Sequence, residues 1–141
     1  MHISTNGINL LKELEGVRYT PYKDVVGLLS VGVGHLLTKS ELTSGKISVG
    51  NSTIFYQGRP LTEGEVDTIL RQDLDTAETT VTTCITVAIT QSQFDCLTSL
   101  CFNIGVSAFA ESTLRKKLNQ GLYDEVPTQL RRWVYAGGKQ V

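Results

Sequence analysis

The feature that most constrains the fold is a change in the spacing of apolar residues along the chain. Before residue 16, and again after residue 62, apolar side chains recur three or four positions apart, which is the spacing of one helix face. Between Val17 and His35 the chain is instead rich in glycine and β-branched residues, which are typical of short strands and tight turns. Helices on both sides of a small β-rich segment predict an α+β protein.

The N-terminal helix is expected over residues 6–15. Its apolar face carries Ile8, Leu11 and Leu14. Gly16 follows at a position that favours the end of a helix. After the β-rich segment, residues 38–60 are polar and are expected to be irregular, apart from a hairpin around 49–56. This part of the chain therefore predicts one short helix and several short strands.

Two capping boxes mark the longer helices. Thr62 stands three residues before Glu65, and Thr90 stands three residues before Gln93. In this pattern each side chain satisfies a backbone N–H that the first turn of a helix leaves unpaired. The second of these helices is expected to end at Gly105. Each box is followed by apolar residues at helical spacing, so two amphipathic helices are predicted.

The length of 141 residues fits a single domain. Within it we expect a β-rich lobe at about 16–60, a connecting helix at about 62–83 and a helical lobe at about 90–141. Further helices of that lobe are expected near 113–120 and 125–136, each followed by glycine. The prediction is thus an α+β chain with a small β-rich N-terminal lobe and a helical C-terminal lobe joined by a long helix.

Charge is unevenly distributed although the whole chain carries only −1. Residues 112–141 hold six basic residues against two acids, a net charge of +4. This charge fits either an ordinary solvated helix face or a surface that attracts a polyanion, and charge alone does not separate the two.

No apolar run approaches the ~18 residues of a membrane span, and Lys12, Glu13 and Glu15 interrupt the N-terminal apolar stretch before it could form a signal peptide.

Cysteines and histidines do not suggest a metal site. Three cysteines (Cys84, Cys96, Cys101) lack a Cys-x-x-Cys pair, and we expect them to be buried structural thiols. The two histidines are too scattered for a zinc signature, and His35 is expected to be a hydrogen-bonded structural side chain. No cofactor or metal ion is predicted.

Three polar residues, one at the end of the first helix and two within the β-rich segment, could carry chemistry. Glu15 ends the first helix, where the negative end of the helix dipole disfavours an ionised carboxylate, so it could donate a proton. Asp24 lies in a predicted exposed turn and should stay ionised, and Ser30 could hold a water molecule against it. Two carboxyl groups in contrasting environments are typical of glycosidic bond cleavage. Spacing alone favours a structural role for both acids, since acids at helix ends and in turns are common.

The order of residues across the chain resembles that of the phage-type lysozymes, the endolysin family. The resemblance lies in EGVRYTPYKDVVGLLSVGVGHLLTKS from Glu15 to Ser40, in QSQFDCLTSLCFNIG at 91–105 and in AFAESTLRKKLNQG at 108–121. It continues with Trp133 and the AGGK segment at 136–139. It covers nearly the whole chain and is weakest across about 41–60.

The resemblance implies a lysozyme-like fold and a muramidase that hydrolyses the β-1,4 bond between N-acetylmuramic acid and N-acetylglucosamine in peptidoglycan. It assigns Glu15 as the general acid, Asp24 as the second catalytic carboxylate and Ser30 as the hydroxyl residue, where the family usually carries Thr. It implies that Asp24 and Ser30 position the attacking water and that the reaction inverts the anomeric configuration. Leu36 and Phe102 match residues that line the saccharide cleft, although Phe102 could equally be a core residue.

The resemblance also implies a setting: accumulation in the host cytoplasm and action on the cell wall after a separate holin has opened the membrane. Alternatives are a lytic transglycosylase, which needs one Glu and no water-positioning Asp, and an inactive peptidoglycan-binding module. A nucleic-acid-binding domain is disfavoured because no recognition helix is evident. Family members typically continue beyond the AGGK segment, so with the sequence ending at Val141 we expect part of the helical lobe's apolar surface to stay open.

Overall fold

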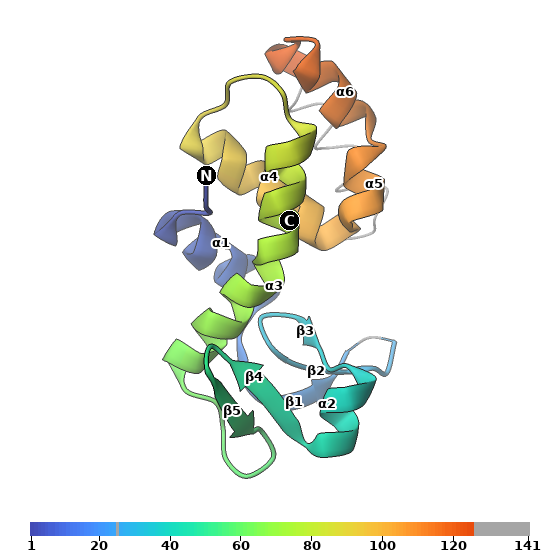
Figure 1. The fold of residues 1–141 in the computed structure, drawn as a ribbon. Coiled ribbons are helices and arrows are strands. Elements are labelled where there is room, and N and C mark those ends of the chain that lie inside the picture. The colour runs from blue at the N-terminus through green and yellow to red at the C-terminus, as the bar shows by residue number, and fades with distance from the viewer. Residues whose placement is uncertain (25, 126–141) are drawn as a thin grey trace. The chain divides into compact units, whose positions relative to one another are not determined.

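The computed structural model describes residues 1–24 and 26–125, and it has the predicted α+β architecture (Figure 1). The helices are α1 (Thr5–Glu15), α2 (Lys39–Ser44), α3 (Glu63–Cys84), α4 (Gln91–Ile104), α5 (Val106–Ala110) and α6 (Thr113–Asn119), followed by a 3-10 turn at Tyr123–Glu125. The strands are β1 (Arg18–Lys23), β2 (Leu29–Gly32), β3 (His35–Leu36), β4 (Lys46–Val49) and β5 (Ser52–Phe55). Two compact units result: a β-rich unit, Asn9–Leu74, and a helical unit, Met1–Ile8 with the residues from Asp75 onward.

The β-rich unit contains two small antiparallel sheets, one with the order β1-β2-β3 and one formed by β4 and β5. In the first sheet the register of β1 against β2 shifts between Arg18 and Tyr22. Pro21 lies within this shift, and a proline has no N–H to donate to a ladder. The irregularity of β1 therefore follows directly from the sequence.

The second sheet is a hairpin whose turn is Gly50 and Asn51, because Val49 pairs with Ser52. Gln72 on α3 holds this turn: its Oε1 accepts the Gly50 N–H at 2.7 Å, and its Nε2 donates to the Ser48 carbonyl at 3.0 Å. The hairpin was predicted at about 49–56. It begins earlier, at Lys46, and the glycine at its turn takes a left-handed φ of 62°.

The helical unit is built around a continuous apolar cluster. Its buried members are Ala77, Val81, Ile85, Phe94, Leu97, Cys101, Phe109, Leu114 and Leu118. The capping box predicted at Thr90 and Gln93 is present: the Thr90 hydroxyl accepts the Gln93 N–H at 3.1 Å, and the Gln93 side chain accepts the Thr90 N–H at 2.8 Å. Thr62 and Glu65 form the same reciprocal pair at the start of α3, at 3.2 and 2.8 Å.

The N-terminal residues are tied into the helical unit by two carboxylates. Glu78 is buried and accepts the Ile3 N–H at 2.6 Å, and Asp95 accepts the Ser4 N–H at 2.9 Å. Gly7 packs so closely here that a Cβ would lie 2.7 Å from Ile3 and 2.9 Å from Asp95. A side chain at position 7 would therefore force the N-terminal turn of α1 away from α4.

Three predictions need correction. Residues 38–60 are not wholly irregular, because α2 forms at Lys39–Ser44 behind a capping box of Thr38 and Glu41 that the sequence contains. Leu14 is 41% exposed, so only Ile8 and Leu11 of the predicted face are buried. Cys96 is exposed rather than buried, because the buried face of α4 is set by the positions of Phe94, Leu97, Thr98 and Cys101.

Several predicted features lie outside the described residues. These are the helix at 125–136 beyond its first position, Trp133, the AGGK segment and the basic residues after Lys117.

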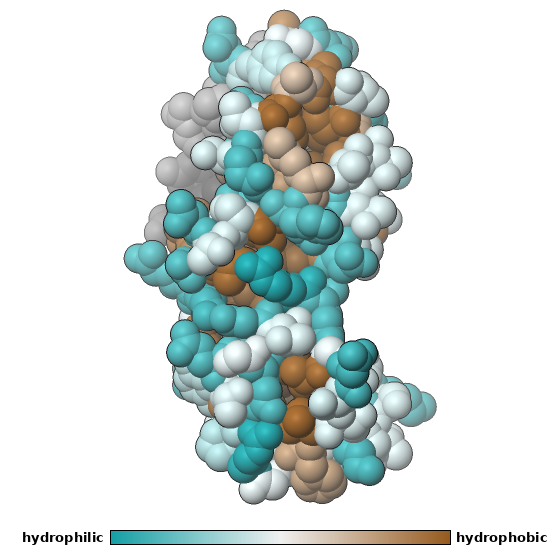
Figure 2. Space-filling view, turned by 60° about the vertical axis from the view of Figure 1, so that its left-hand side comes forward, coloured by the Kyte–Doolittle hydropathy of each residue, from teal (hydrophilic) through white to brown (hydrophobic). Residues whose placement is uncertain are grey.

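Among the helices that the structure describes, none is long and apolar enough to cross a membrane. On the face drawn in Figure 2, apolar side chains gather in separate patches among polar and charged ones.

Candidate active site

Glu15 owes its position to the way helix α1 ends. It is the last helical residue, and Gly16 follows in the left-handed region at φ 79°, with its N–H donated to the Lys12 carbonyl at 2.9 Å. Lys12, one turn earlier, forms an ion pair with Asp67 and lies 3.9 Å from Glu63, both at the start of α3. The last turn of α1 is thus anchored, and it presents a half-buried Glu15 at the negative end of the helix dipole.

Asp24 lies directly after β1, in the turn that leads to β2. Its Oδ1 accepts two backbone N–H groups, from Val26 at 3.0 Å and from Leu28 at 2.9 Å. Its own N–H donates to the Leu28 carbonyl at 2.8 Å, which extends the β1–β2 ladder by one rung. The Asp24 side chain is half-buried and held in place by the turn that it organises.

Strand register places Asp24, Ser30 and Leu36 on one face of the first sheet. Ser30 pairs with Tyr22 on one side and with Leu36 on the other, and directly paired residues share a face. Asp24 follows Tyr22 by two residues and its N–H extends the ladder, so strand alternation places its Cβ on that same side, from which the carboxylate bends back to the Val26 and Leu28 N–H groups. Asp24 and Ser30 are diagonal neighbours, a relation that separates Cα atoms by about 7–8 Å in a regular ladder.

The environment of these residues differs sharply along the face. Ser30 is only 4% exposed, whereas Leu36 is 51% exposed and Leu28, opposite Asp24, is 50% exposed. A buried hydroxyl and a half-buried carboxylate at diagonal positions of a ladder, with exposed apolar side chains around them, are groups that can orient a water molecule. Glu15 belongs to the same unit, at the end of the helix that leads into β1.

Phe102 lies in the helical unit rather than on this sheet. It is partly buried on α4 and packs against the apolar cluster of that unit. This packing is what a core residue would show, which is the alternative to a role in the saccharide cleft. Its predicted role as a substrate contact stays a prediction.

His35 sits at the centre of a polar network that the sequence did not predict as a whole. Its Nδ1 lies 2.7 Å from Asp73 Oδ2, and its Nε2 lies 2.9 Å from Glu41 Oε1. Burial of the ring lowers its pKa, but the hydrogen bonds and charges of Asp73 and Glu41 outweigh this effect and raise the pKa to about 9. His35 is thus the hydrogen-bonded structural side chain that was expected, and as a cation it ties β3 to α2 and α3.

A sequence signal existed for only one of the two acids in this network. Glu41 completes the Thr38 capping box, where it accepts the Thr38 N–H at 2.9 Å while also meeting His35. Asp73 lies 38 residues from His35 and carries no local signal. Only the packing of α3 against the sheet brings it there.

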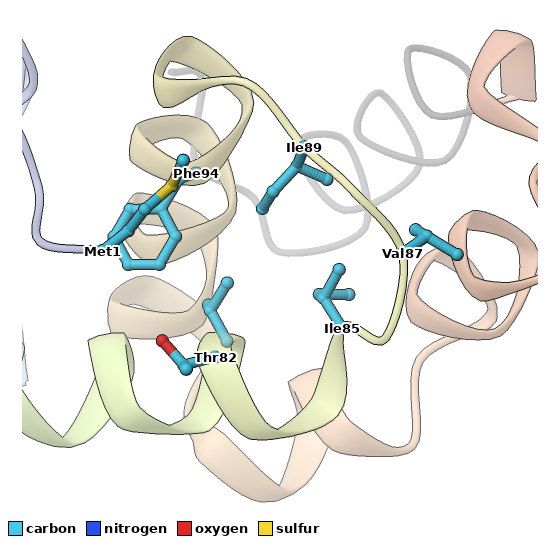
Figure 3. Close-up of a pocket in the computed structure, with 7 residues that line it drawn as sticks. Met1, Thr82, Ile85, Val87, Ile89 and Phe94 are labelled. Carbon is cyan, nitrogen blue, oxygen red and sulfur yellow. The ribbon is translucent and has the colours of Figure 1, made fainter.

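A small pocket of about 150 Å³, whose lining side chains are mostly apolar, lies in the helical unit (Figure 3). It is lined by Met1, Val81, Thr82, Ile85, Val87, Ile89 and Phe94. None of the candidate residues is among the described residues that line it, and within that set Thr82 contributes the one hydroxyl group. Across residues 1–24 and 26–125, no group of three or more His, Cys, Asp or Glu side chains is arranged to hold a metal ion.

Comparison with known proteins identifies the fold and the family. The family model described as phage lysozyme matches residues 12–141. The chain is 38% identical over 137 residues to the endolysin of Salmonella phage P22, covering 97% of this chain and 86% of the relative. It is 42% identical over 127 residues to a SAR-endolysin of bacteriophage PS119, covering 90% of this chain and 67% of the relative.

Solved structures agree with this assignment. The muramidase domain of SpmX from Asticaccaulis excentricus matches with a TM-score of 0.75 and 30% identity, covering 95% of this chain and 81% of that one. A mutant of P22 lysozyme matches with a TM-score of 0.73 and 37% identity, covering 92% of this chain and 81% of that one. The fold is lysozyme-like, as expected, and the class of protein is a glycoside hydrolase. The chain belongs to the phage lysozyme family and is a muramidase endolysin whose substrate is peptidoglycan.

Proposed function

We propose that Glu15, Asp24 and Ser30 hydrolyse the β-1,4 bond between N-acetylmuramic acid and N-acetylglucosamine. Glu15 donates a proton to the leaving glycosidic oxygen, and Asp24 takes a proton from the attacking water. The Ser30 hydroxyl orients that water. The observation that carries the proposal is the shared sheet face of Asp24 and Ser30, on which the Asp24 carboxylate is fixed by two backbone N–H groups.

The proposed reaction inverts the anomeric centre. Water activated by Asp24 attacks from the face opposite the leaving group, so the cleaved β bond gives an α product. Leu36, half exposed on the same face as Ser30, is proposed to contact a sugar ring. Proton NMR of freshly cleaved peptidoglycan oligosaccharide should show the α anomer first, and a β anomer would favour a covalent intermediate on Asp24 instead.

Glu15→Gln tests the general acid. An amide has no proton to donate at this step, so we expect the variant to fold and to lose at least about 100-fold in the rate of peptidoglycan clearing. Glu13→Gln, on the exposed side of the same helix and with the same change of charge, is the matched control and should keep the parent rate. Near-parent clearing by a folded Glu15→Gln protein would exclude Glu15 as the acid.

Product mass separates hydrolysis from the transglycosylase alternative. Hydrolysis adds one water to the products, whereas a transglycosylase leaves an anhydro sugar that is lighter by that water.

We also propose that the chain accumulates in the host cytoplasm and reaches the wall only after a separate holin opens the membrane. Expression of the chain with and without a holin should then give lysis only in the first case.

A further inference from the structure

The Asp24 carboxylate has a second role in the turn where it sits. One of its oxygens, Oδ1, accepts the N–H groups of Val26 and Leu28, and the Asp24 carbonyl accepts the Gly27 N–H at 3.0 Å. The reversal between β1 and β2 is therefore closed around a single carboxylate oxygen. Rotation of the carboxylate would break both bonds to Oδ1 together, so the turn fixes the plane of the group.

The two oxygens of Asp24 are consequently not equivalent. Oδ1 already accepts two hydrogen bonds from the loop, which uses the lone pairs that a carboxylate oxygen offers. The bonds that the structure describes for the side chain are both on Oδ1, so Oδ2 is the oxygen left to meet water. This division depends on the peptide between Gly27 and Leu28, because that peptide supplies the Leu28 N–H.

Gly27 sets the direction of that peptide. Its φ is 86°, in the left-handed region that residues with a side chain rarely adopt. Apart from its two chain neighbours, no residue that the structure describes has an atom within 4 Å of the position that a Cβ would take, so a substitution there meets open space among those residues. Any effect of a substitution on the site must then come from the backbone and not from a steric clash.

We infer that Gly27 is a positioning residue for the reaction: its left-handed backbone aims the Leu28 N–H at Asp24 Oδ1 and so reserves Oδ2 for the attacking water. The inference rests on the proposed function of Asp24 as the base. Gly27 touches no substrate in this scheme. It acts through the orientation of the Asp24 carboxylate.

Gly27→Ala, Gly27→Asn and Gly121→Ala form the test set. Asn tolerates the left-handed region better than Ala, so it should restore the turn. Gly121 has a similar φ of 80°, and among the described residues beyond its chain neighbours none lies within 4 Å of its Cβ position, so Gly121→Ala applies the same backbone strain in the helical unit. We expect Gly27→Ala to lower kcat about 10- to 100-fold with little change in KM, because small misplacements of a reacting group cost this much. Gly27→Asn should recover most of the rate, and Gly121→Ala should keep the parent rate.

Three outcomes would overturn the inference. They are a parent kcat for Gly27→Ala, an equal loss for Gly27→Ala and Gly27→Asn, and an equal loss for Gly121→Ala. Initial rates over a range of peptidoglycan concentrations give the split between kcat and KM, and thermal unfolding shows that each variant is folded.

Amide exchange on Asp24 variants separates this inference from the proposed function. Asp24→Asn keeps a carbonyl oxygen that can accept both N–H groups, so the Val26 and Leu28 amides should stay protected in an inactive protein. Asp24→Ala removes the acceptor and should release both amides to fast exchange, measured by NMR. Unchanged protection in Asp24→Ala would overturn the inference, whereas an active Asp24→Asn would instead overturn the role of Asp24 as the base.

Discussion

Ser30 lies in the middle strand of its sheet and is only 4% exposed, so its hydroxyl is placed by the strand and not by a mobile loop. A hydroxyl that orients water should tolerate Thr, whose β-branched side chain also suits a strand. We expect Ser30→Thr to clear peptidoglycan within a few-fold of the parent and Ser30→Ala to be slower by about tenfold or more. Equal turbidity rates for Ser, Thr and Ala at position 30 would remove this hydroxyl from the mechanism.

The ion pair of His35 with Asp73 joins β3 to α3, and it makes the stability of the β-rich unit depend on pH. The folded pKa of His35, about 9, lies above its ordinary 6.5, so its contribution is complete below about pH 6.5 and is lost as the pH rises through 9. Because the ring keeps some contact with solvent, we expect the charged His35 to contribute roughly 1–3 kcal/mol to the free energy of unfolding. Asp73→Asn should therefore destabilise the protein most near pH 6 and least above pH 9 in urea unfolding.

The exposed Asp75, two residues along α3, gives a matched control for this change of charge. Asp75→Asn should shift the unfolding free energy by a few tenths of a kcal/mol with little dependence on pH. If the free energy of unfolding of Asp73→Asn were lowered by the same amount at every pH, the side chain would act through packing and not through the charge of His35.

Helix α3 contributes to both compact units, since residues 63–74 belong to the β-rich unit and 75–84 to the helical unit. A break at this boundary should therefore affect the whole molecule. Asp75→Pro removes a backbone N–H in the helix interior and should cost about 3 kcal/mol, which lowers the thermal midpoint by several degrees or more. Asp75→Ala should leave the midpoint nearly unchanged. Circular dichroism melting checks both, and a parent midpoint for Asp75→Pro would show that the units do not depend on a continuous α3.

Local chemistry in the sequence determined the helix ends, the α+β architecture and the candidate acids. Thr90 with Gln93 and Gly16 act within one turn of a helix, so a single segment contains all that is needed to predict them. The same local pattern, Thr38 with Glu41, marks the start of α2 within a stretch whose polar composition predicts irregular structure.

What the tertiary structure decided are relations between distant segments. Strand register put Ser30 and Leu36 on the face of Asp24, and a shift of one residue would have turned either away. Asp73 meets His35 only because α3 packs there, across 38 positions of chain. The sequence indicates Asp24 as a candidate acid. Which of its carboxylate oxygens accepts the N–H groups of the loop depends on the backbone direction at Gly27. Composition and periodicity specify which residues are available, whereas pairing, register and peptide orientation arise only when the whole chain has packed.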